Sequence, residues 1–161
     1  MTFNDSSTTL RINFKTKNGS QTYSTLWTGD AYRYQSKWMC VMYGTYLKSD
    51  MVQVSHHGGP GCEISFYELV DPTVVWWPHT ASAVVSYTND PNTTSFNKSV
   101  DYYIRYNLES VKYIYISDIY NITLTLKPSG PDYNNLYDAV GHQTISYADW
   151  STRKPVAAIK R

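Results

Sequence analysis

The chain of 161 residues carries 14 Lys and Arg against 13 Asp and Glu, which gives a formal net charge of +1. Hydrophobic residues make up 42% and charged residues 17%, a balance that excludes a disordered chain and predicts one folded domain. The near-neutral charge gives no overall attraction to nucleic acid or to an anionic membrane. No apolar run approaches the roughly 18 residues that a membrane span needs, so no membrane segment is expected.

The first residues, 1–6, lack the basic and apolar regions of a signal peptide, so we expect a cytoplasmic protein. Cys40 and Cys62 are too few for a disulfide framework or a thiolate zinc site, and we expect free thiols.

Two short strands are expected at residues 9–14 and 22–27, and the Asn18-Gly19 turn between them predicts a hairpin. A helix is expected next, since residues recur there with steps of three and four: Ala31, Tyr34, Trp38, Val41 and Thr45. Asp30 can cap this helix.

The middle of the chain alternates expected strands and helices. Residues 51–54 and 74–77 are short apolar runs typical of buried strands, and 56–61 is too rich in Gly and Pro for regular structure. A second helix is expected between them, because Cys62, Phe66, Leu69 and Val70 form an apolar stripe that ends before Pro72.

Residues 78–96 are expected to be irregular, followed by a helix around 100–108 and strands at 113–116 and 122–126. We divide the chain at residue 127, with residues 128–161 as an aromatic and basic extension. Alternating strands and helices predict a mixed α/β layer structure.

Two features have the residue types of a metal or catalytic site. Asp30 follows an expected strand, where a carboxylate projects into the crevice in which α/β proteins usually bind ligands. His56 and His57 follow the next expected strand, and imidazole suits zinc, iron or manganese. The alternatives stay open at this point: Asp30 as a helix cap, and two loop histidines without a ligand.

In combination, these segments resemble the metallo-β-lactamase superfamily, in particular the hydrolase-like domain of the competence-protein (DNA-uptake) type. The resemblance rests on three stretches in the family's order: Asn4-Asp5-Ser6-Ser7, Leu26-Trp27-Thr28-Gly29-Asp30, and Leu47-Lys48-Ser49-Asp50-Met51-Val52-Gln53-Val54-Ser55-His56-His57-Gly58. The exit Asp71-Pro72-Thr73-Val74-Val75 is similar to the family's helix-to-strand segment.

The resemblance implies an α/β fold that is half of a metallo-β-lactamase-type αβ/βα sandwich, a mixed sheet with helices packed on it. It also implies a dinuclear site for zinc or another divalent metal, with Asp30 and His56 as ligands. His57 is implied as a second-sphere or substrate-facing group, with the roles of His56 and His57 left open between the two, and Asp50 is implied as a structural anchor. His79 follows the expected strand at 74–77, which places it either at the same crevice as a further second-sphere or substrate-facing group or in a loop without a ligand.

The family's first ligand motif, His-x-His-x-Asp-His, is absent, since the four histidines are His56, His57, His79 and His142. The chain therefore resembles only the carboxyl-terminal half of the family's domain. A catalytic zinc needs three protein ligands, so we expect weak metal binding and no activity from this chain alone.

We therefore expect a truncated metal-dependent hydrolase, acting on a phosphoester or similar bond when completed by a homo-oligomer partner or by a missing amino-terminal half. Nucleic acid is a possible substrate only through the resemblance. The alternative is a non-catalytic binding or oligomerisation module on a decayed half-fold, for which the 16 Tyr and 5 Trp suit an interface.

Overall fold

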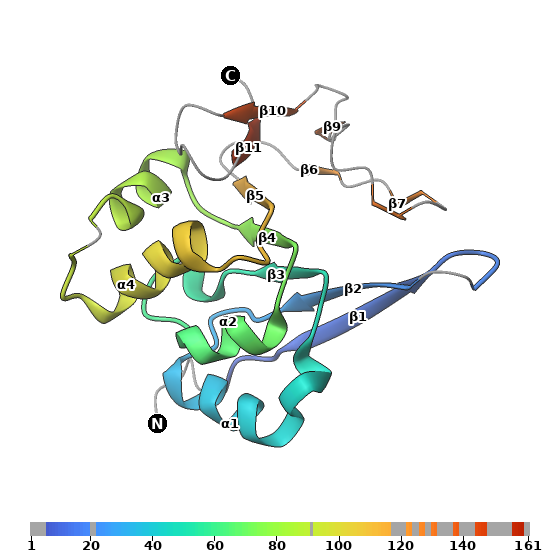
Figure 1. Ribbon diagram of the computed structural model, residues 1–161, viewed down its shortest axis with the longest axis horizontal. Coiled ribbons are helices and arrows are strands. Elements are labelled where there is room, and N and C mark those ends of the chain that lie inside the picture. Colours follow the sequence, from blue (N-terminus) through green and yellow to red (C-terminus); the bar gives the residue numbers. More distant parts are fainter. Residues whose placement is uncertain are drawn as a thin grey trace.

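The computed structural model describes residues 6–19, 22–90 and 92–116, and the backbone of six short strand segments between residues 122 and 159 (Figure 1). The chain is an α/β protein whose centre is a five-strand mixed sheet with four helices.

The sheet begins with an antiparallel hairpin and continues with parallel strands. β1 (Leu10–Lys15) pairs with β2 (Thr22–Trp27), as the Asn-Gly turn predicts. β3 (Met51–Gln53), β4 (Val74–Trp77) and β5 (Tyr113–Ile116) follow in chain order, each parallel to its neighbour.

Further strands come from the last third of the chain. β11 (Val156–Ile159) pairs with β5, and β10 (Thr144–Tyr147) pairs with β11, so the sheet continues beyond the central five strands. Two small pairs complete the set: β6 (Ile122–Thr123) with β9 (Tyr137–Asp138), and β7 (Leu126–Lys127) with β8 (Gly130–Pro131).

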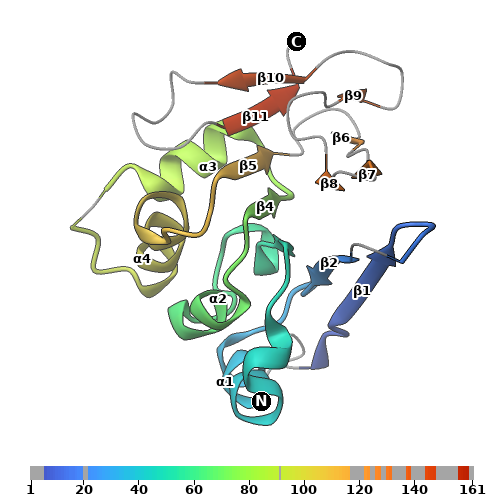
Figure 2. The ribbon, with the colours of Figure 1, turned by 45° about the vertical axis from the view of Figure 1, so that its right-hand side comes forward.

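The helices lie in the connections between the parallel strands. α1 (Arg33–Tyr43) joins β2 to β3, α2 (Ile64–Val70) joins β3 to β4, and α3 (Ala81–Thr88) and α4 (Phe96–Tyr102) join β4 to β5. All four cover one face of the sheet (Figure 2). Short helical turns extend α1, through Gly44–Leu47, and α4, through Tyr103–Asn107.

Strand alternation separates two faces of the sheet. Leu26, Val52, Val75 and Ile114 form one row across the four parallel strands and pack with the helices in the main core. The opposite face is rich in aromatic rings, with Trp27 and Trp76 in contact at a centroid distance of 5.9 Å. Each of these four strands therefore contributes to both layers, as the period of two requires.

Several expectations are confirmed. β2, β4 and β5 have the expected bounds, and Asp50 is the anchor of β3, since its Oδ2 accepts hydrogen bonds from Ser24 N (2.7 Å) and Ser24 Oγ (2.8 Å). Trp77 is fully buried in the core. Cys40 and Cys62 are free thiols.

Two expectations are wrong. Asp30 does not cap α1: the helix begins after Tyr32, and Asp30 lies in a preceding turn closed by a bond from Ala31 N to Thr28 O (3.1 Å). Residues 78–96 are not all irregular, because α3 forms there. Thr80 caps this helix by accepting a hydrogen bond from Ala83 N. Val84 and Thr88 are the buried residues on the side of the helix that faces the core.

Within the described residues, no helix has the length and apolar character that a membrane crossing needs.

Candidate metal centre

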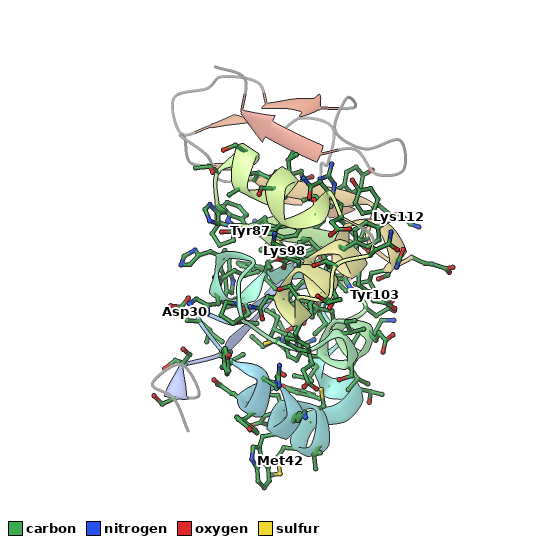
Figure 3. The ribbon with its side chains drawn as sticks, turned by 90° about the vertical axis from the view of Figure 1, so that its left-hand side faces the viewer. Asp30, Met42, Tyr87, Lys98, Tyr103 and Lys112 are labelled. Atoms are coloured by element: carbon green, nitrogen blue, oxygen red, sulfur yellow. The ribbon has the colours of Figure 1, made fainter. Side chains whose placement is uncertain are left out.

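The candidate site lies at the carboxyl ends of three adjacent parallel strands. Asp30 follows β2, His56 and His57 follow β3, and His79 follows β4. Because these strands run in the same direction, their exits meet at one edge of the sheet. Figure 3 shows Asp30 and Tyr87 on the same side of the molecule, away from Tyr103 and Lys112.

The loops after β2 and β3 are joined by hydrogen bonds. The N–H of His56 donates to the carbonyl of Gly29 (3.1 Å), and the hydroxyl of Ser55 donates to the carbonyl of Ala31. The hydroxyl of buried Tyr67 in α2 accepts from Ser55 N at 3.0 Å. Burial raises the pKa of Tyr67 well above its ordinary value, so this anchor remains a neutral phenol.

The loop after β3 is also fixed to the end of β4. The indole N–H of Trp77 donates to the carbonyl of His57 (3.1 Å), and His57 Nδ1 lies 2.9 Å from the carbonyl oxygen of Pro78. A carbonyl oxygen only accepts, so Nδ1 must carry a proton. In the neutral ring, Nε2 then holds the lone pair.

That nitrogen faces a carboxylate. His57 Nε2 lies 3.6 Å from Asp30 Oδ1, and the side chains of His57 and Asp30 are 55% and 44% exposed. Tetrahedral zinc with N and O ligands at about 2.1 Å separates two ligand atoms by about 3.4 Å. Two donor atoms at this spacing therefore fit a divalent ion between them, and a protonated His57 would form an ion pair with Asp30 instead.

His56 and His79 are placed differently. His56 Nδ1 lies 3.2 Å from the carbonyl of Pro60, so its ring turns toward the glycine-rich loop, and its centroid is 6.5 Å from that of His57. His79 Nδ1 accepts from Thr80 N (2.7 Å), and its Nε2 lies 3.5 Å from the hydroxyl of Tyr87. Both nitrogens of His79 thus have partners, and its ring packs edge-on against His57 at 6.4 Å.

The donor set within the described part of the chain is small: no group of three or more His, Cys, Asp or Glu side chains is placed to hold a metal ion there. Cys62 supplies no thiolate, because burial raises its pKa to about 12. His142 lies outside the described residues. Asp30 and His57 are therefore the pair on which a metal site in this region would depend.

The sequence singled out Asp30 and both histidines, with His56 as the expected ligand and His57 as the second-sphere group. In the structure it is His57 that faces Asp30, whereas the Nδ1 of His56 lies against the carbonyl of Pro60. The sequence did not identify the carbonyl of Pro78 or the side chain of Tyr87. Pro78 and His79 directly follow a buried strand, as Asp30 and the histidine pair do, and that shared position is the signal that could have included Pro78. Every residue has a backbone carbonyl, so the residue type of Pro78 could not indicate that its carbonyl binds His57.

In comparisons of this chain with protein-family models, with curated proteins and with solved structures, no match was found.

Proposed function

We propose that this chain supplies Asp30 and His57 to a divalent metal site of a metal-dependent hydrolase that resembles the metallo-β-lactamase superfamily. The observation that carries the proposal is the 3.6 Å separation of Asp30 Oδ1 and His57 Nε2, with the opposite nitrogen of His57 held by the carbonyl of Pro78. Metal-binding histidines commonly donate their second ring N–H to such an acceptor.

The backbone of the histidine loop supports a site at this place. His56 and His57 have φ values of 51° and 59°, in the left-handed region that is unfavourable for side chains with a Cβ. Strained non-glycine residues of this kind cluster at functional sites, where the surrounding contacts maintain the strain. The hydrogen bonds to Gly29, Pro60 and Pro78 are those contacts.

The proposed fold is a half-sandwich. A sheet with helices on one face and aromatic rings on the other is the layer arrangement that a carboxyl-terminal half of an αβ/βα sandwich would have. A bound divalent metal would supply an activated water and would polarise the scissile phosphoester or similar bond. The further ligands would come from a second copy or from an amino-terminal half, and nucleic acid as substrate follows from the resemblance alone.

Metal binding tests the proposal. The purified chain is equilibrated with Zn²⁺ or Mn²⁺, the bound metal is counted by elemental mass spectrometry, and the affinity is measured by competition with a chromophoric chelator. We expect Asp30→Ala and His57→Ala to weaken zinc binding by at least about tenfold. The matched control is Asp90→Ala, which removes an exposed loop carboxylate away from the site and should leave the affinity unchanged.

The same titration separates the two adjacent histidines. His57 faces Asp30 and His56 faces Pro60, so His57→Ala should reduce the affinity more than His56→Ala does. The proposal fails if the wild-type chain binds no zinc at millimolar concentration, or if Asp30→Ala and His57→Ala bind as the wild type does.

A second candidate function, self-association, is favoured by the outward side of α1. Tyr34, Trp38, Val41 and Met42 occupy one stripe of this helix and are 57%, 64%, 79% and 66% exposed. These four side chains expose on the order of 600 Å², most of the roughly 800 Å² that each partner buries in a stable dimer. A second copy is the occupant that we propose for this stripe.

Light scattering across a concentration series tests self-association. The wild type should reach twice the mass of one chain, and Trp38→Glu should remain a monomer because it places a charge in the apolar contact. Lys98→Glu, on α4, is the control for an added acidic residue and should dimerise as the wild type does. A monomeric wild type, or a Trp38→Glu variant that dimerises equally well, would contradict this candidate.

A further inference from the structure

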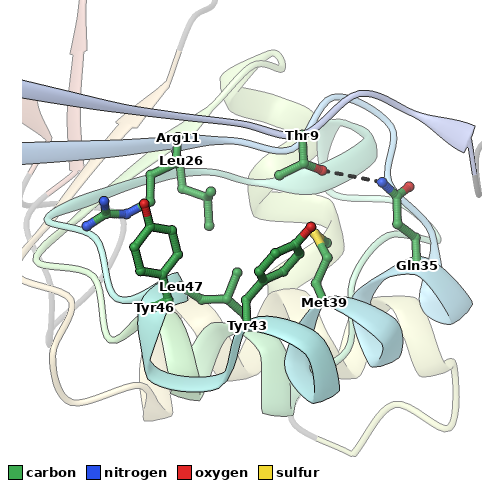
Figure 4. A pocket seen from close by; sticks show the side chains of 8 residues that line it. All are labelled: Thr9, Arg11, Leu26, Gln35, Met39, Tyr43, Tyr46 and Leu47. Carbon is green, nitrogen blue, oxygen red and sulfur yellow. Dashed lines mark hydrogen bonds between the residues drawn. The ribbon is translucent and has the colours of Figure 1, made fainter.

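A slot separate from the candidate metal centre lies between the β1–β2 hairpin and α1 (Figure 4). Its volume is about 260 Å³. Its floor is made by Leu26, Met39 and Leu47, which are buried and belong to the main core. The volume of the slot suits a ligand of one ring or two fused rings, and its apolar floor disfavours a cluster of water molecules.

Two tyrosines form the open side of the slot. Tyr43 and Tyr46 are 56% and 66% exposed, and Figure 4 shows both rings rising from the α1 side beside Leu47. Flat aromatic walls over an apolar floor favour a planar ligand, because stacking and desolvation then act together. Such an exposed concave apolar surface is unusual unless something binds there.

The charge of the lining selects among planar ligands. Among the described residues that line the slot, Arg11 is the one with a charged side chain, and its guanidinium carbon lies 5.0 Å from the centre of the Tyr46 ring. Its hydrogen bonds go to Ser49 Oγ (3.3 Å), Asn13 Oδ1 (2.7 Å) and the carbonyl of Lys48 (3.0 Å). These acceptors are neutral, and no carboxylate pairs with Arg11 within the described ranges.

Within the described part of the chain, the guanidinium charge at one edge of the slot therefore has no carboxylate to neutralise it. The three hydrogen bonds use three of the five guanidinium N–H groups and fix the orientation of the side chain. The field of this charge attracts an anion and repels a cation, since none of the described residues that line the slot is acidic.

We propose that this slot is a binding site for a small planar aromatic carboxylate. The ring would lie against Leu26, Met39 and Leu47 between the two tyrosines, with its carboxylate toward Arg11. The site is independent of the metal centre, because it shares no residue with Asp30, His57 or the loops that hold them.

A matched set of three probes tests both the shape and the charge of the ligand. We would titrate 2-naphthoate, its neutral amide 2-naphthamide and the cation 2-naphthylmethylamine, each in the presence of a chelator, and follow binding by saturation-transfer difference NMR and calorimetry. The expected dissociation constant for 2-naphthoate is about 1 mM or below, with the amide weaker and the cation weakest.

Variants locate the binding. Arg11→Gln should weaken 2-naphthoate about tenfold, to the level of the amide, and leave the amide unchanged. Lys15→Gln removes the same charge from an exposed position on β1 and should change neither probe. An equal loss of both probes in Arg11→Gln would indicate structural damage and would overturn the charge assignment.

A second pair of variants tests the wall of the slot. Tyr43→Ala should weaken both the acid and the amide at least fivefold, whereas Tyr34→Ala, an equally exposed tyrosine of the same helix outside the slot, should weaken neither. The proposal is overturned if no probe binds saturably, if the amide binds as tightly as the acid, or if the two tyrosine variants behave alike.

Discussion

Gly58 closes the loop that orients His57, and two separate constraints act on it. Its φ of 79° lies in the left-handed region, as do those of His56 and His57 before it. A Cβ on Gly58 would lie 2.2 Å from Nε1 of Trp77, whose indole is fully buried. The indole cannot move aside easily in a close-packed core, so the loop can approach β4 only with glycine at this position.

Gly58→Ala should therefore destabilise the protein by at least about 2–3 kcal/mol, because the steric clash adds to the strain of a left-handed alanine. The control is Gly19→Ala, since Gly19 also has a positive φ (69°) but nothing within 4 Å of its would-be Cβ. That variant should lose only about 1 kcal/mol. Urea unfolding measures both, and equal losses would contradict the role of Trp77.

Asp101 is a buried carboxyl group on α4 that is 2% exposed. Its Oδ2 has no hydrogen-bond partner in the part of the chain that the structure describes. Burial disfavours the charged form and raises the pKa of Asp101 from 3.8 to about 8. Between these two values the folded protein keeps a proton that the unfolded chain has lost, so stability should fall as the pH rises through this window.

Asp101→Asn removes this titration and keeps the shape of the side chain. We expect the variant to gain stability relative to the wild type between pH 5 and pH 8, by about 1 kcal/mol per pH unit over most of that range. Urea unfolding at four pH values gives the difference, in which the histidines common to both proteins cancel. A difference that stays constant with pH would show that Asp101 is already ionised in the folded state.

At the scale of elements, α1 shows what residue periodicity can and cannot predict. The spacing of Tyr34, Trp38 and Val41 correctly indicated a helix, yet this stripe faces outward, and the buried residues are Ser36 and Met39. Ser36 belongs inside because its Oγ donates to Arg33 O and accepts from Glu63 N, which joins α1 to the start of α2. A polar contact between helices leaves no apolar periodicity, so the sequence could not identify this face.

The two faces of α1 give opposite expectations for neighbouring residues. Met39→Ala removes a buried side chain and should destabilise the protein by about 2–4 kcal/mol. Trp38→Ala removes a larger but exposed side chain and should change the stability by less than about 0.5 kcal/mol. The measurement is urea unfolding at a protein concentration low enough to keep the chain monomeric, and a larger loss for Trp38→Ala would mean that the helix is turned the other way.

The other elements differ in how far the sequence predicted them. The parallel strands were predictable because runs such as Val74-Val75-Trp76-Trp77 are apolar on both faces. α3 was missed because turn residues surround a helix of eight residues that has no charged side chain. The direction of the parallel strands predicted that Asp30 and the histidine pair lie close together. Which imidazole ring faces Asp30 depends on the left-handed backbone of His56 and His57. The residue types do not predict that backbone conformation.

At the scale of the whole molecule, the proposed metal ligands join segments from two strand-to-helix crossings, so metal binding should stabilise the entire fold. Zn²⁺ at about 100 times its dissociation constant should add about 2.7 kcal/mol, a rise in Tm of about 5–10 °C. A chelator should reverse the rise. Thermal unfolding followed by circular dichroism is the measurement.

His57→Ala should abolish this stabilisation, whereas His79→Ala should retain it because both ring nitrogens of His79 already have partners. A zinc-dependent rise in Tm that survives in His57→Ala would place the metal elsewhere on the chain.

The order of the parallel strands has a consequence for biosynthesis. β2, β3, β4 and β5 lie side by side in the order in which they leave the ribosome, so each new strand can add to an edge that already exists. Asp30 and His57 emerge early, but the ring of His57 gains its acceptor only when Pro78 has emerged and β4 has paired. The geometry of the candidate metal centre can therefore be completed during translation, while α4 and β5 are still being synthesised.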